Sequence, residues 1–103
     1  METGIKQKVL DEIKALARKY HIQRVILFGS RARGDFHRTS DIDLAVLGGD
    51  VNRFALDVEE ETDTLLMFDI VDLGRSVQEE LREAIEKEGK VLYEGYFFLF
   101  RTL

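Results

Sequence analysis

Two aspartates separated by one residue, Asp41 and Asp43, are the first candidates for chemistry in this chain of 103 residues. Residues 41–46 alternate polar and apolar side chains apart from Ala45, which predicts a half-buried strand with both carboxylates on one face, about 6.5–7 Å apart at Cα. Like charges so close raise each other's pKa, and a divalent cation such as Mg²⁺ or Mn²⁺ relieves the repulsion. The pattern favours a metal site, although an Asp-x-Asp pair alone also fits two exposed residues at a strand edge.

A third carboxylate follows in another predicted strand, residues 68–73. Asp69 is the candidate from that strand, because Asp72 lies on its opposite face. If the two strands are neighbours, Asp69 would complete a set of three carboxylates of the kind that bridges two metal ions.

The second candidate feature is Gly29-Ser30, which follows the apolar segment 25–28 and is separated from Asp41 by ten residues. On its own, Gly-Ser after a strand is usually a turn. If a short helix begins at Ser30, its free N–H groups and the positive end of its dipole would cradle a phosphate, and the Ser30 hydroxyl would add a donor. Strand pairing would bring this cradle beside the aspartates, as a metal-bound nucleoside triphosphate requires.

Together, residues 29–34 and 40–44 resemble the signature of the DNA polymerase β-type nucleotidyltransferase superfamily. From the first predicted helix to about residue 94, the chain resembles the smallest branch of that superfamily, the minimal nucleotidyltransferases. Residues 68–73 are similar to the strand that carries the family's third carboxylate, and the match favours Asp69. The resemblance implies an α+β fold (mixed α/β), with a small mixed β-sheet flanked by helices.

The resemblance also implies an activity, the Mg²⁺-dependent transfer of a nucleoside monophosphate to a hydroxyl group, with AMP from ATP as the preferred case. The residues that it assigns to catalysis and to metal binding are Asp41, Asp43 and Asp69. The residues that it assigns to nucleotide binding are Gly29, Ser30, Arg33 and Ser40. Phosphoryl-type transfer depends mostly on positioning and charge neutralisation, so this short set is chemically sufficient.

The role of Arg33 stays open between a phosphate contact and a brace that pairs with a local carboxylate. Arg31 and Arg38 are interpreted as solvated loop residues. His37 and His21 are interpreted as exposed residues rather than as a base or a metal ligand.

The resemblance further implies a partner, because the minimal branch is often paired with a HEPN-domain toxin that it neutralises, in some members by adenylylating a tyrosine. One alternative is a catalytically silent antitoxin that neutralises its toxin by contact alone. Another is a nucleotidyltransferase that modifies a small molecule such as an aminoglycoside. That alternative ranks low, because those enzymes carry a further substrate domain.

Apolar periodicity predicts the elements that must position these residues. The predicted helices cover residues 3–20, 51–66 and 77–87, and the predicted strands cover residues 25–28, 41–46, 68–73 and 90–94. Ser76 and Glu79 have the spacing of a capping box, and Gly89 stands where a C′ glycine belongs.

Composition describes an ordinary globular chain, 45% hydrophobic and 34% charged, without cysteine. We expect a single cytoplasmic domain over residues 1–103, because neither a membrane-spanning run nor a secretory signal is visible. Residues 1–40 hold nine Lys or Arg and four Asp or Glu, a net +5, whereas residues 41–103 hold six and sixteen, a net −10. This acidity around the aspartates argues against direct nucleic-acid binding, although an acidic half is more often a solvated helix surface.

An apolar tail, residues 95–103, ends the chain with the run Tyr-Phe-Phe-Leu-Phe at 96–100. Left exposed, such a run is an aggregation hazard. We expect the tail to pack on the helices of the domain itself or to form a surface that binds a second copy or a partner protein. A third alternative is that the tail is a truncated or unusual C-terminus, beyond what the family ordinarily has after residue 94.

Overall fold

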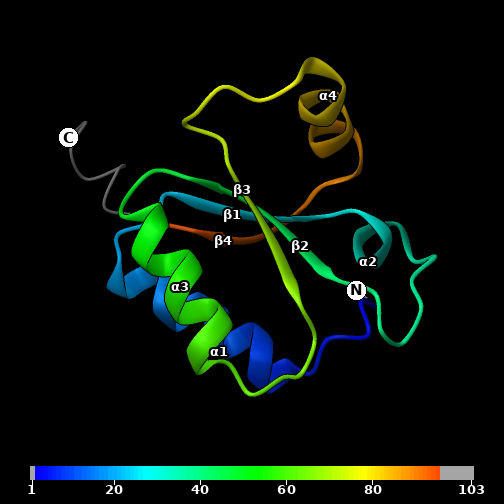
Figure 1. The fold of residues 1–103 in the computed structure, drawn as a ribbon, viewed down its shortest axis with the longest axis horizontal. Coiled ribbons are helices and arrows are strands. Elements are labelled where there is room, and N and C mark those ends of the chain that lie inside the picture. The colour runs from blue at the N-terminus through cyan, green and yellow to red at the C-terminus, as the bar shows by residue number, and fades with distance from the viewer. Residues whose placement is uncertain (1, 96–103) are drawn as a thin grey trace.

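The computed structural model describes residues 2–95 and shows a four-stranded mixed sheet with helices on both faces, which confirms the predicted α+β class (Figure 1). The strands are β1 (Arg24–Phe28), β2 (Ile42–Leu47), β3 (Phe68–Asp72) and β4 (Lys90–Glu94). The helices are α1 (Gln7–Lys19), α2 (Ser30–Arg33), α3 (Val51–Glu61) and α4 (Glu79–Glu88).

The strands lie in the order β3-β2-β1-β4. β1 pairs antiparallel with both β2 and β4, and β2 pairs parallel with β3. A parallel pair requires a crossover connection, and α3 provides it between β2 and β3. This topology brings the end of β1 and the beginnings of β2 and β3 to one edge of the sheet.

The larger core lies between the sheet and the pair α1 and α3, which cover the same face (Figure 1). The apolar stripes of the two helices meet alternate residues of β1 and β2 there. The fully buried side chains of this core include Val9, Ile13, Ala17, Val25, Leu27, Ile42, Leu44, Val46, Phe54 and Val58. Ile42, Leu44 and Val46 face this core, so the predicted half-buried strand is confirmed.

The opposite face of the sheet is covered by α4, and its core is smaller (Figure 1). Phe28, Ala45 and Ile85 are its buried members. Because side chains alternate along a strand, Asp43 of β2 lies on the same face as Ala45, on the side of α4. The candidate site is thus on the more lightly covered face.

Two helix boundaries differ from the predictions by four residues or more. α1 begins at Gln7 rather than at residue 3, and the Thr3 hydroxyl instead accepts a hydrogen bond from the Ile5 amide. α3 ends at Glu61, not at residue 66, because Thr62 takes an extended backbone conformation and its hydroxyl donates to the Val58 carbonyl. Leu65, which the predicted helix included, is fully exposed.

The predicted capping box of α4 is wrong. Gln78 is the N-cap, no side chain caps the helix, and Ser76 lies outside it. Gly89 follows the helix as predicted, but its φ of −64° is one that any residue adopts. A glycine is needed there for space, because a Cβ would collide with the Ile85 carbonyl and lie 2.5 Å from Cγ2 of Ile26.

Within residues 2–95, no helix is long and apolar enough to cross a membrane. The predicted apolar tail lies, from residue 96 on, outside the described residues.

Candidate active site at the edge of the sheet

The register of the sheet brings two predicted carboxylates side by side. Asp43 of β2 and Asp69 of β3 are direct partners in the parallel pair, on strands that lie roughly 4.8 Å apart. Asp41 precedes β2 by one residue and shares the face of Asp43. Asp72 is paired with Val46 three residues further along β3, and its carboxylate accepts a hydrogen bond from the Gly74 amide.

The electrostatics of Asp43 show that these carboxylates interact. Partial burial raises the pKa of the Asp43 carboxyl group, and the negative charges of Asp69 and Asp41 raise it further. The positive charges of Arg33 and Arg31 lower the same pKa without cancelling the rise. The ionised form of Asp43 is therefore less favourable than that of a solvated aspartate, and a nearby cation would offset this cost.

Gly29 lies directly against this carboxylate. It follows β1, whose last residue Phe28 is paired with Asp43, and it has a φ of +74°, in the region that favours glycine. A Cβ at position 29 would collide with the Asp43 carboxylate. The Gly-Ser turn and the aspartates are thus in direct contact, as the sequence predicted.

The one-turn helix α2 begins at this turn, also as predicted. The amides of Ala32 and Arg33 donate to the Gly29 carbonyl at 3.1 and 3.0 Å. The Gly34 amide donates to the Ser30 carbonyl at 2.8 Å and ends the helix. Within the part of the chain that the structure describes, the amides of Ser30 and Arg31 donate to no other group, so both are available to an anion.

Arg31 is buried, with 1% of its surface exposed, which corrects the prediction of a solvated loop residue. Its guanidinium group lies 4.9 Å from the centre of the Phe36 ring. It donates to four backbone carbonyl groups, those of Thr3, His37, Arg38 and Ser40. The helical period could have indicated a difference between Arg31 and Arg33, because residues two apart on a helix point in nearly opposite directions.

Ser40 closes the loop that leads to Asp41. Its hydroxyl accepts a hydrogen bond from the His37 amide at 2.8 Å, and its carbonyl accepts one from Arg31. The side chains of His37 and Arg38 are exposed, as predicted. The structure thus gives Ser40 a role in loop geometry, beside the nucleotide contact that the resemblance implied.

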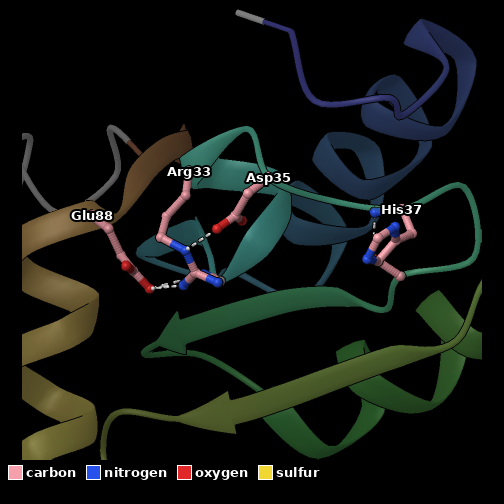
Figure 2. Close-up of polar contacts among 6 residues, drawn as sticks. Arg33, Asp35, His37 and Glu88 are labelled. Carbon is pink, nitrogen blue, oxygen red and sulfur yellow. Dashed lines mark hydrogen bonds and ion pairs between the residues drawn. The ribbon is translucent and has the colours of Figure 1, made fainter.

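Arg33 pairs with two carboxylates, which is the contact that the bracing alternative predicted. Its Nε lies 3.3 Å from Asp35 and its Nη1 lies 3.0 Å from Glu88, while His37 lies apart from this group (Figure 2). Both carboxylates raise the pKa of the guanidinium group. Sequence reasoning missed Glu88, because nothing local distinguishes it from the other acidic residues of α4.

The donor set fits a hard cation. Within residues 2–95, no three His, Cys, Asp or Glu side chains converge closely enough to hold a metal ion without further ligands. Mg²⁺ is ordinarily bound by one or two carboxylates together with substrate phosphates and water. The Asp43 and Asp69 pair, whose charges repel each other, lies beside the predicted phosphate-binding turn and fits that composition, and its oxygen ligands suit Mg²⁺ or Mn²⁺.

Comparisons with known proteins agree with this geometry. A relative from Methanocaldococcus jannaschii, named "Putative protein adenylyltransferase", is 38% identical over 100 residues that cover 84% of this chain and 97% of the relative. A solved toxin–antitoxin structure with AMP-PNP is 32% identical, with a TM-score of 0.65 over 84% of this chain and 73% of that one.

A further solved structure holds a tri-AMPylated HEPN toxin of Shewanella oneidensis in complex with an MNT antitoxin. It is 27% identical, with a TM-score of 0.62, and covers 88% of this chain and 74% of that one. The sequence profile described as "Polymerase beta, Nucleotidyltransferase" matches residues 11–95, which include every candidate site residue. With its carboxylates in register beside the Gly-Ser turn, the chain belongs to the polymerase beta nucleotidyltransferase family, and it is a nucleotidyltransferase.

Proposed function

We propose that this nucleotidyltransferase moves AMP from ATP, with Mg²⁺, to a hydroxyl group on a partner protein, and that the partner is a HEPN-type toxin. One observation carries the proposal, the alignment of Asp43 with Asp69 directly beside Gly29. The names of the similar proteins support the donor and the acceptor, since they include AMP-PNP, a protein adenylyltransferase and an AMPylated HEPN toxin. We expect the reaction to take place in the cytoplasm.

In this proposal the turn at the end of β1 binds the donor. The amides of Ser30 and Arg31 and the Ser30 hydroxyl would hold the β- and γ-phosphates. Asp41, Asp43 and Asp69, together with phosphate oxygens of the donor and water, would hold Mg²⁺, which when bound neutralises the phosphate charge that builds up in the transition state.

Asp69 would also accept the proton of the acceptor. The acceptor oxygen forms a bond to the α-phosphorus, and the bond between the α-phosphorus and the bridging oxygen to the β-phosphorus breaks. Pyrophosphate leaves with that electron pair, and the hydroxyl proton passes to the Asp69 carboxylate. Because Asp69 is exposed at the edge of the sheet, a tyrosine or other hydroxyl of a docked protein can approach it.

The first test is thermal unfolding with each of ATP, GTP, CTP and UTP, with Mg²⁺ and with chelator. A ligand at 100 times its Kd stabilises a protein by about 2.7 kcal/mol, which raises the Tm of a domain this small by roughly 10 °C or more. We expect a Mg²⁺-dependent shift with ATP that Asp43→Asn abolishes. Asp72→Asn is the matched control, because Asp72 lies on the same sheet away from the site, and it should keep the shift.

The second test is transfer to the partner, measured by mass spectrometry of a HEPN toxin incubated with the protein and Mg²⁺–ATP. We expect AMP adducts on the toxin, reduced at least about 100-fold by Asp69→Asn and retained with Asp72→Asn. Neutralisation of the toxin that survives Asp41→Asn with Asp43→Asn would instead show an antitoxin that acts by contact. Transfer to an aminoglycoside without any partner protein would also contradict the proposal.

A further inference from the structure

Glu88, the last residue of α4, contacts both ends of α2. Its Oε1 accepts a hydrogen bond from the Gly29 amide at 3.2 Å and another from Nη1 of Arg33 at 3.0 Å. Gly29 is the N-cap of α2 and Arg33 is its last residue. Figure 2 shows Glu88 reaching Arg33 from α4, on the side of Arg33 away from the loop that carries His37. One carboxylate oxygen therefore bridges the whole one-turn helix.

A helix of four residues needs such support. The first turn of a helix fixes several residues for one hydrogen bond, so an isolated turn is unstable in water. Arg31 anchors α2 to the loop carbonyl groups on its buried side, and Glu88 anchors it on the other side. Bonds to a carboxylate are stronger than neutral ones, and the Glu88 side chain is only 21% exposed, which limits screening by water.

The position of Glu88 is itself fixed by the sheet. Gly89 lets the end of α4 approach Ile26 of β1 more closely than any other residue would. Lys90 then enters β4 as the partner of Leu27, which stands two residues before Gly29. The Glu88 carboxylate is therefore held at a defined place beside the turn.

We propose that Glu88 is a positioning residue for nucleotide binding, whose carboxylate sets the direction of the Gly29–Ser30 turn and of Arg33 relative to Asp43. This inference rests on the proposed function. By positioning the turn, the Glu88 carboxylate would strengthen nucleotide binding. Charge repulsion alone predicts the opposite, because a carboxylate beside a triphosphate repels it and would weaken binding. In our proposal the ordering of the turn outweighs that repulsion, so the two accounts differ in the sign of the effect on affinity.

Three variants separate the accounts. Glu88→Ala removes both hydrogen bonds and the charge, whereas Glu88→Gln removes the charge and keeps an oxygen that accepts from both donors. Glu86→Ala is the matched control, because it removes the same charge from an exposed position of the same helix. The measurements are the Kd for Mg²⁺–ATP by titration calorimetry, the KM and kcat of AMP transfer, and hydrogen exchange of the α2 amides by NMR.

We expect Glu88→Ala to weaken Mg²⁺–ATP binding about tenfold, which corresponds to about 1.4 kcal/mol, and to raise the KM for ATP more than it lowers kcat. The amides of Ala32 and Arg33 should exchange faster in this variant. Glu88→Gln should restore affinity and exchange to within about threefold of the wild type, and Glu86→Ala should match the wild type.

Tighter Mg²⁺–ATP binding by both Glu88 variants would overturn the inference, because the carboxylate would then act by repulsion. Unchanged exchange of the α2 amides in Glu88→Ala would overturn it as well. If the wild type bound no nucleotide, the proposed function would fail, and the exchange measurement alone would still decide whether Glu88 holds the turn.

Discussion

At the scale of single residues, Asp43 shows how the carboxylate arrangement of the candidate site opposes stability. Its pKa is raised above 3.8 by burial and by the neighbouring carboxylates, so the folded state binds the proton more tightly than the unfolded state does. As the pH rises through and beyond the ordinary pKa of an aspartate, this group therefore lowers the free energy of unfolding.

Asp43→Asn should consequently stabilise the protein at pH 7 in a chelating buffer. The gain should stay below about 1 kcal/mol, because the carboxylate is partly solvated and its interactions are screened. Urea unfolding of both proteins at pH 7 and pH 3 measures the effect, which should shrink at the lower pH. A variant less stable than the wild type at pH 7 would show that Asp43 is not under electrostatic strain.

Arg31 provides the opposite case, a charged residue that holds the site together. Arg31→Lys should lower the free energy of unfolding by about 3 kcal/mol, because a single ammonium group cannot reach the four carbonyl groups that the guanidinium group bonds. Arg38→Lys is the control, since that side chain is exposed, and it should change stability by less than about 0.5 kcal/mol. Chemical denaturation would contradict this account if the two variants lost equal stability.

These residues also show what local sequence reveals. Asp41 and Asp43 were predictable because their spacing on a strand places both carboxylates on one face. The helical period could have separated Arg31 from Arg33, but the partners of Arg31 were not predictable, because they are backbone carbonyl groups, which have no signature in sequence. The contact of Glu88 with Arg33 joins residues 55 positions apart, so no local pattern predicts it.

At the scale of elements, two glycines end helices of the site for different reasons. Gly34 ends α2 with a φ of +95° and open space around its Cα, so its requirement is conformational. Gly89 follows α4 with a φ that any residue adopts, so a glycine is needed there because a side chain would collide with Ile85 and Ile26. The sequence predicted the position of Gly89, but only the backbone angles separate the two causes.

Substitutions at the two glycines should therefore respond differently to residue type. Gly34→Ala should cost about 1–2 kcal/mol and Gly34→Asn less, because asparagine tolerates a left-handed backbone. Gly89→Ala should cost about 1–3 kcal/mol through overpacking, and Gly89→Asn at least as much, because its side chain is larger. The four variants would be compared by thermal unfolding. Recovery by asparagine at position 89 would refute the steric explanation.

Helix boundaries were less predictable than helix positions. The apolar pattern correctly located α3, but Leu65 and Leu66 continued the pattern past the true end at Glu61. An extended Thr62 and a bond from its hydroxyl to Val58 stop the helix, and such local bonds compete with helical ones.

At the scale of the whole molecule, the partners of the basic residues and the order of the strands were the features hardest to predict from the sequence. Residues 1–40 carry the excess of basic residues, yet two of these, Arg31 and Arg33, are engaged by groups of the protein itself. The mixed sheet was anticipated from the family resemblance. Its order β3-β2-β1-β4 depends on pairing between distant segments, which alternation within a strand does not encode.

The sheet is also unequally covered, and this inequality coincides with the site. α1 and α3 bury one face with many fully enclosed side chains, whereas α4 contributes Ile85 as its one buried residue among those described. Local opening is easiest where few apolar contacts hold an element, so α4 should open more readily than α1. Glu88 belongs to α4, and opening of this helix would release the Gly-Ser turn.

Native-state hydrogen exchange should therefore show α4 amides exchanging at least about tenfold faster than those of α1, a difference of about 1.4 kcal/mol in opening free energy. Saturating Mg²⁺–ATP should slow exchange in α4 more than global stabilisation alone would, because the bound phosphates order the turn that Glu88 contacts. In Glu88→Ala this extra protection should disappear while the slowing in α1 persists. Equal protection of α1 and α4 by nucleotide in the wild type would mean that the two faces open together and that α4 is not separately linked to the site.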